Sequence, residues 1–216
     1  TRQAITQANL YGLASVEMVS SFERLPYVSN LVNVLIVDLD QLGKSAPDQK
    51  ELLRPLIPGG ELRFKKNGTW QKKIKPTPGG MDEWTHWDHD ASGNPASTDI
   101  YVRPPTSLQW YAGPSTTDNG ADKVGLRIKG GRLHYLLRDY EFEARQRRGS
   151  KRHLVTRDAF NGLLLWKKPI EDVPGRGDNP PRFALTVHGQ RLLTMPKEDG
   201  PMVALVESTE ESMDSL

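Results

Sequence analysis

Cysteine is missing from this chain of 216 residues. Its absence excludes a disulfide framework, a thiolate zinc site and a thiol nucleophile. Long apolar runs are missing as well, because no stretch reaches the roughly 18 consecutive apolar residues that a membrane-spanning helix requires. We therefore expect no membrane span and no chemistry that depends on a cysteine sulfur.

The chain also has little excess charge of either sign, because 29 basic residues nearly balance 27 acidic ones. This balance excludes a broad field that would draw the whole molecule to nucleic acid or to an anionic membrane. The densest basic segment, "ARQRRGSKR" at residues 144–152, follows the acidic "RDYEFE" and carries no interleaved aromatic residues. We expect a solvated loop between two strands there, and no nucleic-acid partner.

Residues 1–75 alternate helix and strand patterns, which is typical of an α/β domain. Residues 1–11 predict a short helix that stops at Gly12, and residues 16–19 predict a strand. "LVNVLIVD" (31–38) is almost continuously apolar, which favours a strand covered on both faces in a parallel sheet, although the pattern also fits a buried helix. Its short length favours the strand.

A helix is predicted next, because Ser45 and Asp48 have the spacing of a capping box. The residues expected on its apolar face are Leu52, Leu53, Leu56 and Ile57. Pro55 should kink or shorten this helix, since proline removes a backbone donor. "PGG" at residues 58–60 then predicts a turn that leads into the strand "ELRFKK".

After "KIKPTPGG" (73–80) the helical period disappears, so we place a domain boundary between residues 75 and 76. Four short apolar runs separated by turn residues predict an antiparallel all-β architecture for residues 76–216. These runs are "LQWYAG", "VGLRIKGGRLHYLLRD", "RHLVTRDAFNGLLLW" and "RFALTVHGQRLLTM". A faint repeat relates "KGGRLHYLL" (129–137) to "VHGQRLLTM" (187–195), and "LVTRDAFNG" (154–162) to "MVALVESTE" (202–210), as in propellers and other repeat folds.

The first part resembles the C-terminal portion of a class I S-adenosylmethionine-dependent methyltransferase. The residues that carry this resemblance are "RLPYVSNLVNVLIVD" (24–38) and "LLRPLIPGGELRF" (52–64). The resemblance implies a partial Rossmann-like fold and places Asp38 and Asp40 at the S-adenosylmethionine pocket. The first strand and the glycine-rich loop of the family are missing, so we expect the donor site to be incomplete in this chain.

The second part is similar to quinoprotein-like β-propellers, also described as PQQ-binding-like. "RDAFNGLLLWKKPI" (157–170) resembles their blade signature, and "EWTHWDHDASGNPAST" (83–98) with "LQWYAGP" (108–114) resembles the segment that leads into their first blade. The resemblance implies a partial propeller that binds a protein or small-molecule ligand, and a parent protein that is exported. It does not imply a quinone cofactor, because nothing in the sequence matches the ligand set.

The most conspicuous polar cluster is "DEWTHWDHD" at residues 82–90. A turn of three-residue period would put His86 and His89 on one edge, as a metal site requires, whereas an extended chain would put them on opposite faces. Imidazole and carboxylate suit zinc, iron or copper. The alternative is architecture, with tryptophans that fill a junction and polar residues that cap turns. We assign no metal.

These observations predict a binding or scaffolding segment, with an incomplete methyltransferase-like domain at residues 1–75 and the first propeller blades at 76–216. We expect the isolated chain to have no activity, because both of its ends would expose halves of folds. One alternative is a methyltransferase whose propeller selects the substrate. The other is a metal-dependent enzyme that uses His86 and His89.

Overall fold

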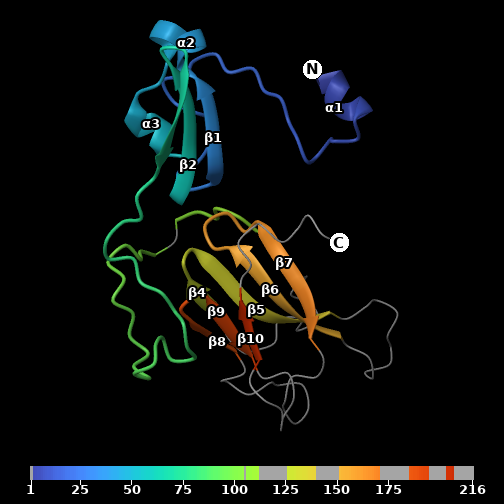
Figure 1. The fold of residues 1–216 in the computed structure, drawn as a ribbon, viewed down its shortest axis with the longest axis vertical. Coiled ribbons are helices and arrows are strands. Elements are labelled where there is room, and N and C mark those ends of the chain that lie inside the picture. Colours follow the sequence, from blue (N-terminus) through green and yellow to red (C-terminus); the bar gives the residue numbers. More distant parts are fainter. Residues whose placement is uncertain are drawn as a thin grey trace. The chain divides into compact units, whose positions relative to one another are not determined.

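The computed structural model describes residues 2–104, 106–111, 126–139, 151–170, 185–194 and 203–206. The chain divides into two compact units, residues 1–76 and 77–216, which are described separately below (Figure 1). The division lies next to the boundary expected at 75/76. The helices of the described residues are all too short to span a bilayer.

Unit 1 contains one small mixed sheet and short helices. Its elements are α1 (Arg2–Gln7), β1 (Val32–Asp38), α2 (Leu39–Leu42), the 3-10 helix η1 (Gly43–Ser45), α3 (Gln49–Leu53), β2 (Leu56–Lys66) and β3 (Thr69–Ile74). The apolar run expected as a strand is β1, so this prediction is confirmed. β1 pairs in parallel with β2, and β2 pairs antiparallel with β3. The short helices between β1 and β2 provide the crossover that a parallel pair requires.

The core of unit 1 lies on one face of the sheet. Leu35 and Val37 of β1 pack with a buried cluster made of Leu52, Leu56 and Leu62. The other face of β1 carries Val34, which is 47% exposed, and Ile36, which is 63% exposed. The expectation that this strand is covered on both faces is therefore wrong, because its alternate side chains meet a core on one side only.

The helix expected after residue 45 is shorter than the apolar spacing implied. Its N-cap is Asp48, whose Oδ1 accepts the Glu51 N–H at 2.7 Å, and not Ser45. α3 ends at Leu53, and Leu56 begins β2. Pro55 explains this, since it has no N–H to continue the helix and disfavours helical geometry in the residue before it.

Three other local expectations for unit 1 are wrong. Residues 58–60, expected as a turn, lie inside β2, where the register with β1 shifts between Val32 and Val34. α1 ends at Gln7 and not near Gly12, and residues 16–19 form no strand. Glycine therefore marks a shift in strand register here, as it does in β-bulges, and not a chain reversal.

A charged network holds the "RLPY" segment against α3. The Arg54 guanidinium donates to both carboxylate oxygens of Glu51, at 2.7 and 2.8 Å, and to the carbonyl oxygens of Leu25 and Tyr27. Glu51 also accepts the Leu25 N–H at 2.7 Å. The Arg54 hydrogen bonds lower the pKa of Glu51 to about 2, so this carboxylate stays ionised at neutral pH.

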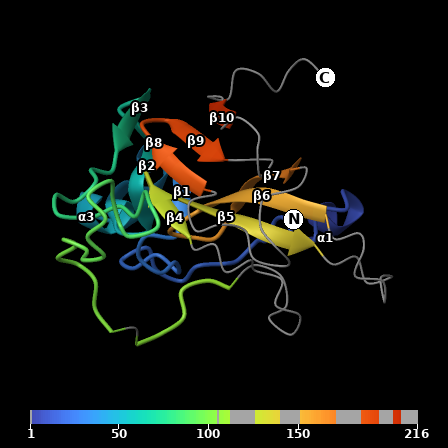
Figure 2. The ribbon, with the colours of Figure 1, turned by 90° about the horizontal axis from the view of Figure 1, so that it is seen from below.

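Unit 2 contains two antiparallel sheets. Its strands are β4 (Arg127–Lys129), β5 (Arg132–Asp139), β6 (Lys151–Asp158), β7 (Leu164–Ile170), β8 (Leu185–His188), β9 (Arg191–Thr194) and β10 (Val203–Val206). The first sheet has the order β4-β5-β6-β7 and the second β8-β9-β10, so neighbours in the chain are neighbours in the sheet (Figure 2). Both sheets are therefore meanders.

The first sheet of unit 2 buries apolar side chains on both faces. On one face, Leu136 and Leu154 pack against the second sheet, which contributes Leu185, Val187 and Leu192. On the opposite face, Tyr135, Leu137 and Val155 form a second buried cluster. An antiparallel sheet with two dry faces is an internal layer of a larger arrangement, because an outermost sheet keeps one face polar.

The faint sequence repeat corresponds to a repeated hairpin. Gly130 and Gly131 form the two-residue turn between β4 and β5, and both adopt positive φ angles, as a type I′ turn requires. Gly189 adopts a positive φ in the two-residue turn between β8 and β9. Arg132 and Arg191 follow these turns at equivalent positions. β6 and β10, the other pair in the repeat, each follow as the third strand of their meander.

The "RDAFNG" motif builds the turn between β6 and β7. Asp158 Oδ1 accepts the backbone N–H groups of Phe160 and Asn161, at 2.9 and 3.2 Å. Gly162 has a φ of +74°, and the ring of Trp110 lies so close that a Cβ at Gly162 would be 2.4 Å from it. Trp110 itself lies in an irregular segment, so the strand expected over "LQWYAG" is wrong for the described residues 108–111.

We predict that Gly162→Ala destabilises unit 2 far more than Gly189→Ala. Both glycines have positive φ, which costs an alanine about 1 kcal/mol. Only Gly162 also faces an aromatic ring, whereas a Cβ at Gly189 has no atom within 4 Å. We expect losses of about 3 and about 1 kcal/mol in the free energy of unfolding, measured by urea denaturation with tryptophan fluorescence. Equal losses would contradict the packing role of Trp110.

Candidate functional site

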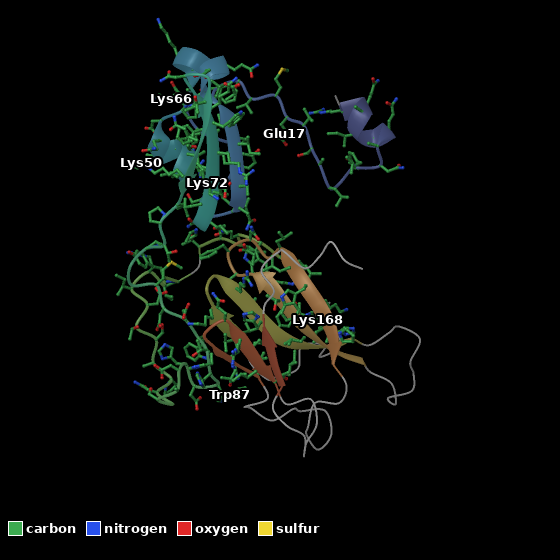
Figure 3. All side chains as sticks on the ribbon, in the orientation of Figure 1. Glu17, Lys50, Lys66, Lys72, Trp87 and Lys168 are labelled. Atoms are coloured by element: carbon green, nitrogen blue, oxygen red, sulfur yellow. The ribbon has the colours of Figure 1, made fainter. Side chains whose placement is uncertain are left out.

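Residues 82–90 join the two sheets of unit 2 by backbone hydrogen bonds. Trp84 and Ile128 of β4 exchange two N–H···O bonds of 2.8 Å. The carbonyl oxygen of Thr85, the next residue, accepts the N–H of Val187 in β8 at 3.0 Å. We name residues 82–90 the linking segment; Figure 3 labels its Trp87. It satisfies edge groups of both sheets at once.

The linking segment folds back on itself in a way that neither expected geometry describes. The N–H groups of Thr85 and His86 donate to the carbonyl oxygen of His89, at 2.8 and 3.1 Å. His89 has a φ of +70°, and the indole N–H of Trp84 donates to the carbonyl oxygen of Trp87 at 3.1 Å. His86 and His89 thus face each other across an antiparallel bridge, which is a chain reversal and not a helical turn.

The side chains of the two histidines have different partners. His89 is buried, and its Nε2 lies 2.7 Å from Asp82 Oδ2. His86 Nδ1 lies 2.8 Å from Thr85 Oγ1. Asp82 Oδ2 also accepts the Thr98 N–H, at 2.6 Å, which with other hydrogen bonds holds the pKa of Asp82 well below its ordinary value.

These partners do not build a metal centre. In the part of the chain that the structure describes, no group of three or more histidine, cysteine, aspartate or glutamate side chains could hold a metal ion. A metal function for His86 and His89 therefore remains a sequence hypothesis with no ligand set around it. The contacts of the linking segment correspond to the architectural alternative.

A buried cation crosses from one sheet to the other beside the linking segment. Arg127 of β4 is 0% exposed, and its Nε donates to the carbonyl oxygen of Leu185 in β8 at 2.8 Å. Its guanidinium carbon lies 5.7 Å from the ring centroid of Trp87, a cation–π geometry. Burial lowers the pKa of Arg127 to about 10, while Asp88 favours the charged form, so Arg127 stays cationic at neutral pH.

A cavity of about 300 Å³ opens where the two repeated hairpin turns come together in unit 2. We name it the turn cavity. Its lining combines charged, polar and apolar residues: Glu83, Lys129, Gly130, Arg132, His134, Val187, Gly189, Gln190, Arg191 and Leu192. Glu83 fixes one wall, because its carboxylate accepts the Lys129 ammonium at 2.5 Å and the Gly130 N–H at 2.9 Å.

The cavity wall becomes less polar along β5. Arg132, His134 and Leu136 are spaced two apart, so they share one face of the strand. Arg132 and His134 line the turn cavity, whereas Leu136 belongs to the dry core between the sheets. His134 is only 2% exposed and its Nδ1 lies 2.8 Å from Thr156 Oγ1. Burial, with a smaller effect of Arg132, lowers the pKa of His134 to about 4, so the ring is neutral at pH 7.

Asp38 and Asp40, the residues assigned to an S-adenosylmethionine pocket, make local structural bonds in unit 1. Asp38 Oδ1 accepts the Gln41 N–H at 3.0 Å and caps α2. Asp40 accepts the N–H groups of Asn67 and Gly68, at 2.8 Å each, and these bonds lower its pKa. Their role in binding a methyl donor remains a prediction.

The sequence analysis did not identify the residues of the turn cavity as a site. The available signal was the repeat itself, since "GGR" and "GQR" place Arg132 and Arg191 after equivalent turns. What the sequence does not show is that the two turns lie together. Residues 144–150 of the basic segment, expected as a solvated loop, lie outside the described residues.

Comparison with known proteins finds no protein-family model, no curated protein and no solved structure that matches this chain. The methyltransferase-like and propeller-like assignments therefore rest on the sequence motifs and on the geometry described above.

We predict that His134 makes unit 2 less stable as the pH falls from 6.5 to 4. In the unfolded chain the histidine titrates near 6.5 and in the folded chain near 4, so the unfolded state binds more protons across this window. The stabilisation is complete above pH 6.5 and is lost as the pH falls through 4. It amounts to about 3 kcal/mol.

The measurement is the free energy of unfolding of unit 2 against pH. His134→Gln keeps a hydrogen-bonding group and should remove this part of the pH dependence. His188→Gln, at an exposed histidine of β8, is the matched control and should leave it unchanged. A pH profile that is the same for His134→Gln and the unaltered chain would contradict the prediction.

Proposed function

We propose that this chain is a binding and scaffolding segment, in which unit 2 supplies consecutive blades of a quinoprotein-like β-propeller that presents a ligand site. The observation that carries the proposal is the turn cavity, where two repeat-related hairpins meet above a shared dry core. The ligand is a small molecule or a side chain of a partner protein. Export of the parent protein remains an expectation from the family resemblance.

The arrangement of strands supports the propeller part of this proposal. A propeller repeats four-stranded antiparallel sheets radially, each packed against the next. In unit 2, β4-β5-β6-β7 is a four-stranded meander, and β8-β9-β10 follows with a corresponding first hairpin. The first strands of the two sheets, β4 and β8, contact each other. The second apolar face of the first sheet, with Tyr135 and Val155, is what an internal blade requires.

The chemistry of the turn cavity favours binding over catalysis. The two groups that could act as acid or base, Glu83 and His134, are each held by structural hydrogen bonds. A general base also needs a pKa near the working pH, and burial moves that of His134 away from it. The mixed polar and apolar lining is typical of small-ligand sites.

The proposal is tested by blocking the cavity. Gln190 is an exposed turn residue that lines it, so Gln190→Trp should fill the space without disturbing the core. We expect a panel of small metabolites to contain members that slow amide hydrogen exchange in peptides covering 129–134 and 187–192, and Gln190→Trp to abolish this protection. Asn94→Trp, at an exposed loop position, is the control and should retain it.

Two results would contradict the binding proposal. One is protection that survives unchanged in Gln190→Trp, which would place the ligand elsewhere. The other is a panel in which no compound protects either peptide, which would leave unit 2 with a structural role alone.

A methyltransferase is the second candidate, because the crossover from β1 to the parallel strand β2 places Asp38 and Asp40 at the carboxyl end of β1. Open α/β sheets bind ligands at that edge. Calorimetric titration with S-adenosylmethionine tests it. Saturable heat that Asp38→Asn abolishes would favour the enzyme, and no heat from a folded chain would argue against it.

A further inference from the structure

We propose that the turn cavity binds a small molecule through an oxyanion, either a carboxylate or a phosphate ester, held by Arg132 and Arg191. The inference rests on the proposed binding function and names the chemical class of its ligand. It comes from three observations: the repeat-related positions of the arginines, the charge balance around the cavity, and the cavity volume.

The two arginines occupy equivalent places in the two hairpins. Each is the first residue of the strand that follows a two-residue turn, Arg132 after Gly130 and Gly131, and Arg191 after Gly189 and Gln190. Because β4 and β8 contact each other, the equivalent positions line one cavity. A repeated cation is thereby delivered twice to the same space, once from each sheet.

The charges around the cavity leave a positive excess. The lining contains three basic side chains, Lys129, Arg132 and Arg191, and one acidic side chain, Glu83, which is bonded to Lys129. His134 is neutral at pH 7, because burial keeps its pKa low.

The charged groups behind the lining do not cancel this excess. They are the buried Arg127, with Asp88 near it, and Asp158, which lies opposite Arg132 in the strand register. With all of them counted, the surroundings of the cavity still carry one net positive charge.

Arginine is suited to this role, because its planar guanidinium donates two parallel hydrogen bonds to a carboxylate or a phosphate. Two arginines on opposite walls also fix the orientation of the ligand. Gln190 and the buried His134 add polar groups for neutral parts of the molecule, and Val187 and Leu192 add an apolar surface. A cavity of about 300 Å³ accommodates a molecule of the size of a monosaccharide derivative.

The test uses three matched probes that share one ring: glucuronate, glucose 6-phosphate and neutral glucose. Calorimetric titration of the full chain should give saturable binding of a charged probe, weaker at high salt because the attraction is screened, and no binding of glucose. The tighter of the two charged probes identifies the carboxylate or the phosphate ester as the preferred oxyanion.

The variants Arg191→Gln and Arg132→Gln should each weaken binding of the charged probe about tenfold. Arg103→Gln, at an exposed arginine of unit 2 outside the cavity, is the control and should bind as the unaltered chain does. Thermal unfolding of each variant verifies that it folds. Arg191 is itself exposed, so its replacement leaves the core intact.

The outcomes separate this inference from the function on which it rests. Binding of glucose as tight as that of the charged probes, and lost in Gln190→Trp, would overturn the oxyanion inference and leave the binding function standing. Binding of a charged probe that is unchanged in both arginine variants would overturn it as well. If none of the three probes binds, the inference fails, and the exchange experiment decides separately whether the cavity binds anything.

Discussion

The architecture of unit 2 depends on the backbone hydrogen bonds that the linking segment makes to β4 and β8. Two small sheets that pack face to face leave edge N–H and C=O groups without partners, and such groups are costly when they are shielded from water. Trp84 and Thr85 satisfy groups on both edges from consecutive positions. Because the segment also carries Glu83 and Trp87, the same connection positions the Lys129 side chain at the cavity and an aromatic ring over Arg127. The site is thus a consequence of how the two sheets are joined.

The space between the sheets changes from dry to polar in one direction, and this gradient explains why a cavity forms at the turns. Leu136, Leu154 and Leu192 close the layer at one end, whereas long charged side chains at the other end keep their heads in water and cannot fill space tightly. Between them, His134 and Thr156 satisfy each other across β5 and β6. A binding site at this position is compatible with a stable core, because the groups that pack and the groups that recognise a ligand lie on different stretches of the same strands.

Hairpins and strands that depend on short-range signals could be predicted from the sequence, and features that depend on contact between distant segments could not. "KGGR" predicted a hairpin because glycine provides the positive φ angles of its turn, and β1 was predicted from a continuous apolar run. Leu56 and Ile57 have helical spacing but lie in β2, since pairing with β1 outweighs the local pattern. The exposed face of β1 was missed because an apolar run does not reveal which of its faces is covered. The turn cavity was missed because it requires two hairpins more than fifty residues apart to meet.

The linking segment also shows why a loop that is dense in aspartate and histidine resembles a metal site in sequence. A chain without regular secondary structure must pair its backbone N–H groups with side chains, and carboxylates are the strongest acceptors available. Asp82 accepts from Thr98, Asp90 accepts from Ser92, and Asp99 accepts from Tyr101 and Val102. A metal ion would have to compete with these bonds for the same oxygens. The useful distinction between a ligand cluster and an architectural one is therefore whether the carboxylate oxygens are already occupied by N–H donors, and residue composition alone does not reveal it.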